Sequence, residues 1–191
     1  MAYTASTGFR FRKTIYGKDT PATLSFRLAN SMTVKIGDLV RLNTGGFLVR
    51  CETTEVPLGV MVGIVNQSGL NPFALGVNSA SATLTPDDQV TSSSTNQTAA
   101  SYLQGEVVID PAGECLWYND SSSTLAQTNL LQFFDVANGN QVTVGGDEAN
   151  GQVQLIQIDP DGDGDASKGL FRINENQFSA GIDTATAKNA A

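Results

Sequence analysis

The chain has 191 residues, a net charge of −8, 16% charged residues and no histidine. Without histidine, the usual general base, the Ser-His and Cys-His nucleophile pairs and most transition-metal sites are excluded. The N-terminus has no apolar segment typical of a secretory signal, and no apolar run has membrane-spanning length. These features predict a protein kept in a reducing cytoplasm, with Cys51 and Cys115 reduced and half-buried.

Charge is divided unevenly along the chain. Residues 1–50 contain eight Lys or Arg and two acids, a net +6, whereas residues 51–191 contain three Lys or Arg and seventeen acids, a net −14. The positive segment is expected to contact something negative, either a partner or the acidic body of the same or a neighbouring copy. Nucleic acid is the less favoured target, because the acidic remainder repels phosphates.

The first half of the chain predicts an extended basic arm over residues 1–21, followed by strands. Residues 22–29 alternate, which predicts a half-buried strand with Leu24, Phe26 and Leu28 on one face. The segments 38–42 and 47–51 flank the loop NTGG and predict a hairpin. The Val-rich, apolar segment 57–65 predicts a central strand covered on both faces. Residues 79–101 are nearly all Ser, Thr, Ala, Asn and Gln, and predict a surface loop.

The second half predicts further short strands. Residues 106–110 and 114–119 lie on either side of the turn sequence DPAG and are predicted to pair. The segment TLAQTNLLQFF is compatible with a short helix, but strands are favoured because Asn138-Gly139 lies between two β-type runs. Residues 152–159 change the phase of their alternation, which a β-bulge or burial of both faces would explain. Residues 169–175 resume it with Phe171 and Ile173 inward.

These segments predict an all-β protein. We expect a single-domain β-sandwich or barrel of about ten short strands over residues 22–178, with a flexible tail over 179–191.

The sequence DPDGDGDASKGL (159–170) resembles the opening of an EF-hand calcium loop. Asp159, Asp161 and Asp163 occupy the first three ligand positions, but Leu170 stands where a bidentate glutamate is required, and a strand precedes the loop. A solvated strand-to-strand turn is therefore favoured over a calcium site built on Asp159, Asp161, Asp163 and Asp165. No P-loop, GxGxxG or nucleophile elbow is present, so no cofactor and no enzymatic activity are expected.

Three segments resemble small structural proteins of tailed bacteriophages, especially podophages and related cyanophages. They are FRLANSMTVKIGDLVRL, PLGVMVGIV and VQLIQIDPDGDGDASKGLFRINENQF, which occur in the order found in that family and cover about half the chain. Phe171 replaces the usual valine of the closing strand, and Asn176 stands where histidine is common. No property of that family that depends on the histidine is therefore expected of this chain.

The resemblance implies a capsid decoration or cement protein, commonly a homotrimer, on the outer surface of the expanded head. Such a protein would be synthesised in the host bacterial cytoplasm and would bridge neighbouring major capsid subunits, without nucleic acid or membrane as partners. The residues expected to bind the capsid are those of the basic arm: Phe9, Arg10, Phe11, Arg12 and Lys13. The arm could add a strand to a partner's sheet, and its charges could pair with acidic capsid patches.

Three alternatives remain at this point. The protein could be a head–tail or tail component of the virion, which copy number would distinguish. It could bind glycans through Trp117 and Tyr118, if these aromatic side chains were exposed. An enzyme with only carboxylates would need two inward-facing acids at a defined separation.

Overall fold

A computed structural model describes residues 8–15, 21–66, 89–145, 151–174 and 176–177. The predicted tail at 179–191 and residues 1–7, 16–20 and 79–88 of the predicted arm and loop lie outside these ranges. The described residues form an all-β protein of three antiparallel sheets, which are not closed into a barrel. None of their helices is long and apolar enough to span a membrane.

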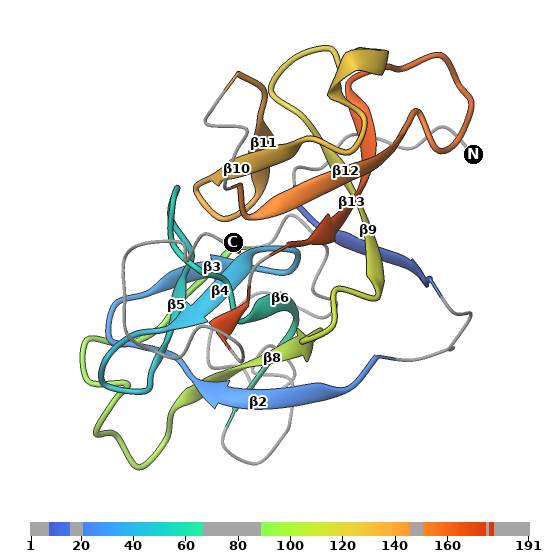
Figure 1. The fold of residues 1–191 in the computed structure, drawn as a ribbon. Helices are drawn as coiled ribbons and strands as arrows, with labels where there is room; N and C mark the ends of the chain where they lie inside the picture. The colour runs from blue at the N-terminus through green and yellow to red at the C-terminus, as the bar shows by residue number, and fades with distance from the viewer. Residues whose placement is uncertain (1–7, 16–20, 67–88, 146–150, 175, 178–191) are drawn as a thin grey trace.

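The two larger sheets form the two halves of the molecule (Figure 1). The six-stranded sheet has the order β1 (Arg10–Thr14), β9 (Cys115–Asp120), β13 (Lys168–Ile173), β12 (Val153–Ile158), β10 (Phe133–Ala137) and β11 (Gln141–Thr143). The five-stranded sheet has the order β2 (Thr23–Arg27), β8 (Leu103–Ile109), β6 (Gly59–Asn66), β4 (Leu39–Leu42) and β5 (Leu48–Arg50). The third sheet pairs β3 (Thr33–Lys35) with β7 (Gln89–Thr91).

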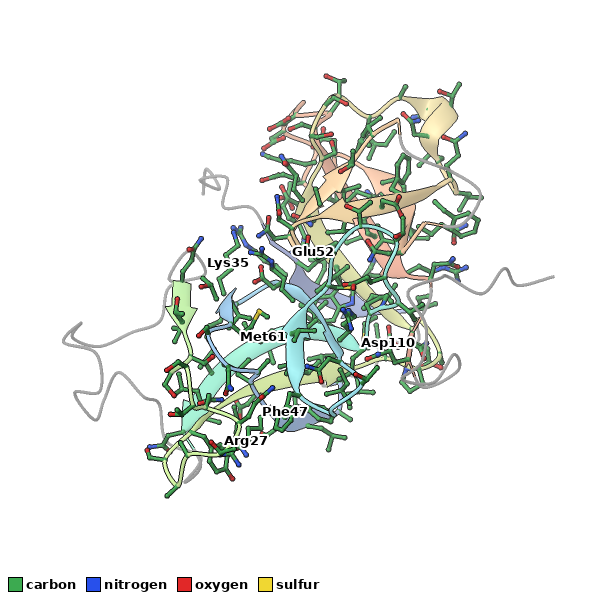
Figure 2. The ribbon with its side chains drawn as sticks, turned by 90° about the vertical axis from the view of Figure 1, so that its left-hand side faces the viewer. Arg27, Lys35, Phe47, Glu52, Met61 and Asp110 are labelled. Atoms are coloured by element: carbon green, nitrogen blue, oxygen red, sulfur yellow. The ribbon has the colours of Figure 1, made fainter. Side chains whose placement is uncertain are left out.

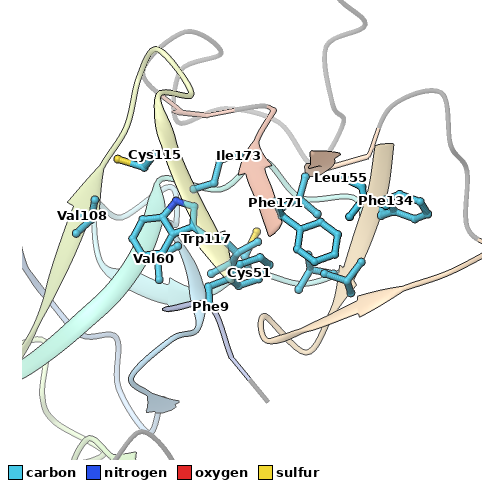
Figure 3. Close-up of a cluster of buried hydrophobic side chains, with 14 of the residues drawn as sticks. Phe9, Cys51, Val60, Val108, Cys115, Trp117, Phe134, Leu155, Phe171 and Ile173 are labelled. Atoms are coloured by element: carbon cyan, nitrogen blue, oxygen red, sulfur yellow. The ribbon is translucent and has the colours of Figure 1, made fainter. Parts of the chain in front are cut away.

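The predicted central strand is confirmed as β6, which lies between β8 and β4. Val60 belongs to a core cluster shared with the six-stranded sheet, in which Trp117 and Phe171 are fully buried (Figure 3). Met61, the next residue (Figure 2), belongs to a second cluster. This cluster includes Val34 of β3 and Val90 of β7. Apolar residues on both faces of β6 are therefore required by two separate cores.

Four local predictions are confirmed. The segments around NTGG form the β4–β5 hairpin. Asn138 and Gly139 both have positive φ, at 50° and 69°, and turn the chain between β10 and β11, as expected for a type I′ turn. The phase change in 152–159 is a β-bulge between Leu155 and Gln157 opposite β13. Phe171 and Ile173 face inward, also as predicted.

Four predictions are corrected by the tertiary structure. Residues 10–14 of the arm are an edge strand of the six-stranded sheet, because they pair with β9. Leu24 is 52% exposed, since β2 extends beyond the core at its first residues. Residues 89–91 of the predicted surface loop are strand β7, with Val90 buried. Cys51 and Cys115 are free, but buried rather than half-buried.

The segments 106–110 and 114–119 also do not pair with one another. The first lies in β8 and the second in β9, which belong to different sheets. The DPAG turn carries the chain between the sheets, and the Asp110 carboxylate accepts the N–H groups of Glu114 (2.8 Å) and Cys115 (2.7 Å). The Asp110 carboxylate thus accepts the two N–H groups that would bond a partner strand if the segments formed a hairpin.

A short 3-10 helix, η2 (Gln127–Asn129), precedes an unusual turn before β10. The Gln132 N–H donates to the Asn129 carbonyl (3.1 Å), Leu130 has φ −61° and ψ 134°, and Leu131 has φ 65°. This is a type II turn with leucine at the position that favours glycine. Leu131 is also 63% exposed, so packing contributes little to offset its strained backbone.

We expect Leu131→Gly to raise the free energy of unfolding by up to about 1 kcal/mol. Glycine removes the steric cost of a left-handed leucine, which is about 1–2 kcal/mol, and part of this gain is lost through the greater entropy of the unfolded chain. Leu130→Gly is the control in the same turn, and it should lower stability because the φ of Leu130 suits any residue and its side chain packs partly on the core. Thermal melting of both variants checks this, and a Leu131→Gly protein that melts below the wild type contradicts it.

Candidate binding strand and acidic turn

The aromatic residues of the FRFRK segment are part of the core. Phe9 is 2% exposed and packs edge-to-face on Phe171, with ring centroids 6.5 Å apart. Phe11 packs in the same manner on Trp117 at 5.7 Å. The N–H of Phe9 donates to the Gly37 carbonyl (2.8 Å). These contacts fix β1 to the body, so Phe9 cannot contact a capsid while this packing persists.

The basic residues of this segment differ in exposure. The Arg12 side chain is 57% exposed and forms an ion pair with Asp161 at 3.7 Å, at the irregularity in the β1–β9 register. Burial raises the pKa of Asp120, and the positive charge of Arg10 partly opposes this effect. Lys13 is exposed. The basic segment therefore neutralises part of the acidic body of its own chain, and Arg12 and Lys13 are the candidate residues left at the surface.

The acidic turn joins β12 to β13, and its aspartates bond the turn's own backbone. Asp159 has φ 44°, and its carboxylate oxygens accept the N–H groups of Asp163 (3.1 Å) and Gly164 (2.9 Å). Asp165 accepts both the N–H (3.0 Å) and the hydroxyl (2.6 Å) of Ser167. The bond from the Ser167 N–H is that of an Asx turn, whereas Asp159 bonds backbone groups four and five residues further on and so closes the wider loop.

Lys168 closes the turn from β13. Its side chain is 8% exposed, and its ammonium lies 2.5 Å from Asp163 and 3.5 Å from Asp165. The hydrogen bond from Lys168 lowers the pKa of Asp163, and the bonds from Ser167 lower that of Asp165. A lysine at this place satisfies the carboxylates as a cation would. No three His, Cys, Asp or Glu side chains gather as a potential metal site within the described residues.

The sequence did not reveal the buried polar junction between the two large sheets. Asp38 is 1% exposed, and its carboxylate accepts the Lys35 N–H (3.0 Å) and the Asn140 side-chain amide (3.2 Å). The Leu39 N–H donates to the carbonyl of Gly139. The turn of the β10–β11 hairpin is thereby docked on the start of β4. The sequence predicted only the Asn138-Gly139 turn, and it gave no sign that this turn meets the start of β4.

Two glycines permit this junction. A Cβ at Gly37, whose φ is 92°, would lie 3.0 Å from both the nitrogen and the oxygen of Phe9. A Cβ at Gly139 would lie 2.6 Å from Arg50 and 2.9 Å from the Leu39 carbonyl oxygen. The close approach of three backbone segments at this point requires residues without side chains.

A second polar contact crosses the sheets at Gln152, which is 1% exposed. Its amide nitrogen donates to Cys51 Sγ (3.3 Å) and to the Glu52 carbonyl (2.9 Å), and its oxygen accepts the Val136 N–H (2.8 Å). Burial strongly raises the pKa of the Cys51 thiol. This cysteine is therefore a packed structural residue and a poor nucleophile.

Trp117 and Tyr118 do not form an exposed aromatic platform. The Trp117 side chain is fully buried, and Tyr118 is 8% exposed. A sugar ring stacks only on an accessible aromatic face, so the glycan-binding alternative loses the residues on which it depended.

The three segments on which the family resemblance was based meet at Gln177. Its side chain accepts the Leu42 N–H (2.7 Å) and donates to the Leu42 carbonyl (2.9 Å), which binds the end of the closing segment to β4. Its own N–H donates to the Pro57 carbonyl (2.9 Å), at the start of the segment that contains β6. One residue thus joins all three segments, although they lie far apart in the sequence.

We expect Asp159→Ala to lower the free energy of unfolding by about 1–2 kcal/mol, because two backbone N–H groups lose their acceptor and alanine is strained at this φ. Asp161→Ala is the matched control. It removes only the exposed contact to Arg12 and should change stability by less than about 0.5 kcal/mol. Urea unfolding of both variants checks this, and equal effects would show that the turn does not depend on Asp159.

Acid should loosen the same turn. The folded-state pKa values of Asp163 and Asp165 lie below the ordinary value of 3.8, so their contribution is present above that pH and is lost as pH falls through the lower folded-state values. NMR titration of the carboxyl carbons should show both midpoints below 3.8. In Lys168→Met, the Asp163 midpoint should move up towards 3.8, and an unchanged midpoint contradicts the assigned role of Lys168.

No known protein family, no curated protein and no solved structure matches this chain.

Proposed function

We propose that this protein is a structural component of a tailed-phage virion that binds the outer surface of the head. There it stabilises the expanded capsid by bridging major capsid subunits, and it does so as a homotrimer. The observation that carries the proposal is that the three segments resembling phage structural proteins are joined to one another through Gln177. The resemblance therefore involves residues that belong to one bonded unit.

The way in which the buried polar side chains are used supports a mechanical role. Buried polar side chains such as Asp38, Asp110 and Gln152 bond backbone groups and hold turns and sheets together. A protein of this kind acts through the shape and charge of its surfaces. On a capsid, symmetric repetition would multiply weak contacts into avidity.

The packing of β1 changes how the capsid contact is proposed to form. Phe9 and Phe11 hold the strand in its own sheet, so the contact is assigned to the exposed side chains of Arg12 and Lys13. β1 pairs only with β9 in the described residues and forms an edge of the sheet. Its charged side chains can reach acidic groups on a capsid subunit without any rearrangement of the fold.

The direct test is to sediment purified protein with expanded and with unexpanded empty heads. Retention on expanded heads supports the proposal, and the absence of retention on both forms overturns it. The double variant Arg12→Glu, Lys13→Glu should reduce retention at least several-fold, because it replaces attraction by repulsion. The matched control, Arg12→Lys with Lys13→Arg, keeps the charge and should be retained. Equal retention of both variants would remove β1 from the contact.

A head–tail or tail component is the second candidate, and the same segment resemblance supports it. Copy number in the particle separates the two. A decoration protein should approach the major capsid protein in abundance, whereas a component of the tail or portal region should be scarce.

A further inference from the structure

Among the edge strands of the two large sheets, β2 is the least protected in the part of the chain that the structure describes. β1 contains a register irregularity and basic side chains, which are common means of preventing edge pairing. β5 and β11 are three residues long, and isolated bridges tie them to Leu28 and Ser121. β2 pairs with β8 in continuous register, contains no proline, and exposes Thr23, Leu24 and Ser25.

The register defines which backbone groups of β2 face outward. Ile109 donates to the Ala22 carbonyl (3.0 Å) and Leu28 donates to the Leu103 carbonyl (3.0 Å). Because bonded and non-bonded pairs alternate along an antiparallel ladder, even-numbered residues bond β8. The N–H and C=O groups of Thr23 and Ser25 therefore point away from β8, towards the outer edge.

Two features limit the outer edge to residues 22–26. Pro21, which has no N–H group, precedes it. At the other end, the Leu28–Leu48 bridge and the Ala29 N–H bond to Leu48 (2.9 Å) place β5 beside the chain. Arg27 lies at this end (Figure 2), where its guanidinium is bonded to the carbonyls of Asn96 and Ala99. The centre of the outer edge is Leu24.

We propose that β2 pairs antiparallel with β2 of a second copy of this chain, about a twofold axis at Leu24. In this register Thr23 lies opposite Ser25 of the other copy, so the outward groups of both residues form four backbone hydrogen bonds. Leu24 lies opposite Leu24 as a non-bonded pair, the class in which side chains approach most closely. The contact covers an exposed leucine that the monomer leaves in water.

A second copy is the occupant that the charges favour. Residues 22–26 are uncharged, although the chain has a net charge of −8, so two acidic copies can meet at this edge without placing like charges opposite one another. The second copy also has an edge of the same length, with the same limits. The proposal does not rest on the proposed function, and its twofold symmetry is separate from any threefold arrangement on a capsid.

Cysteine substitution tests this register. In Leu24→Cys the two Cα atoms would lie about 4.5 Å apart, within the range of about 4.4–6.8 Å that a disulfide needs. In Thr23→Cys and Ser25→Cys, the like residues would be about 8 Å apart, on the diagonal. We expect covalent dimers on mild oxidation from Leu24→Cys and at least about tenfold less from the two controls. Equal crosslinking by all three variants, or none by Leu24→Cys, overturns the proposal.

Ser25→Pro provides the complementary test. Proline removes an outward N–H that the β2–β8 ladder does not use, so the fold and Tm should be retained while crosslinking of Leu24→Cys, Ser25→Pro is lost. Undiminished crosslinking overturns the strand-pairing geometry. If Ser25→Pro instead abolishes retention on phage heads and Leu24→Cys does not crosslink, the edge binds a capsid subunit and the second-copy proposal is wrong. Retention on heads without any crosslinking overturns the pairing of two copies but still supports the proposed function.

Discussion

The arrangement of the two large sheets depends on one buried contact, in which the Gly37-Asp38 turn meets Phe9 on one side and the turn at Gly139-Asn140 on the other. Asp38 bonds its own turn and the turn of the opposite sheet, so a single carboxylate holds β4 and the β10–β11 hairpin together. Unpaired, these buried groups would cost several kcal/mol. Because they are paired, the polar junction specifies one relative position of the sheets, which the apolar core alone would specify less sharply.

The two large sheets are built on a similar plan. In each sheet an isolated parallel bridge joins an edge strand to the residue that directly follows an earlier strand. Leu28, after β2, bridges to Leu48 of β5, and Ser121, after β9, bridges to Val142 of β11. These bridges occupy part of the outer edges and leave few backbone groups for other chains. Within the described residues, the aspartates of the acidic turn bond backbone groups and Lys168, and Cys51 is buried. The outer surface of the described residues presents the basic strand β1 and the short uncharged edge at β2.

Local patterns were predicted well where a single physical cause acted within a few residues. The Asn138-Gly139 turn follows from the positive φ that these residues tolerate, and the bulge at Leu155–Gln157 follows from the phase of the alternation. Predictions failed where the partner was distant. DPAG was expected to close a hairpin, but it changes sheets because Asp110 satisfies the corner. Phe9 was assigned to a partner protein, although its binding site is Gly37 and Phe171 of the same chain.

The sequence by itself determined the all-β class, the covered central strand β6 and the interpretation of DPDGDGDASKGL as a turn, because periodicity and turn chemistry depend on neighbouring residues. Only the tertiary structure decided which strands share a sheet, that the basic segment is the edge strand β1, and that Leu24 lies at an open edge. Pairing between distant strands depends on the complementarity of whole surfaces, and a basic or apolar residue has the same local pattern whether its partner lies in the same chain or in another.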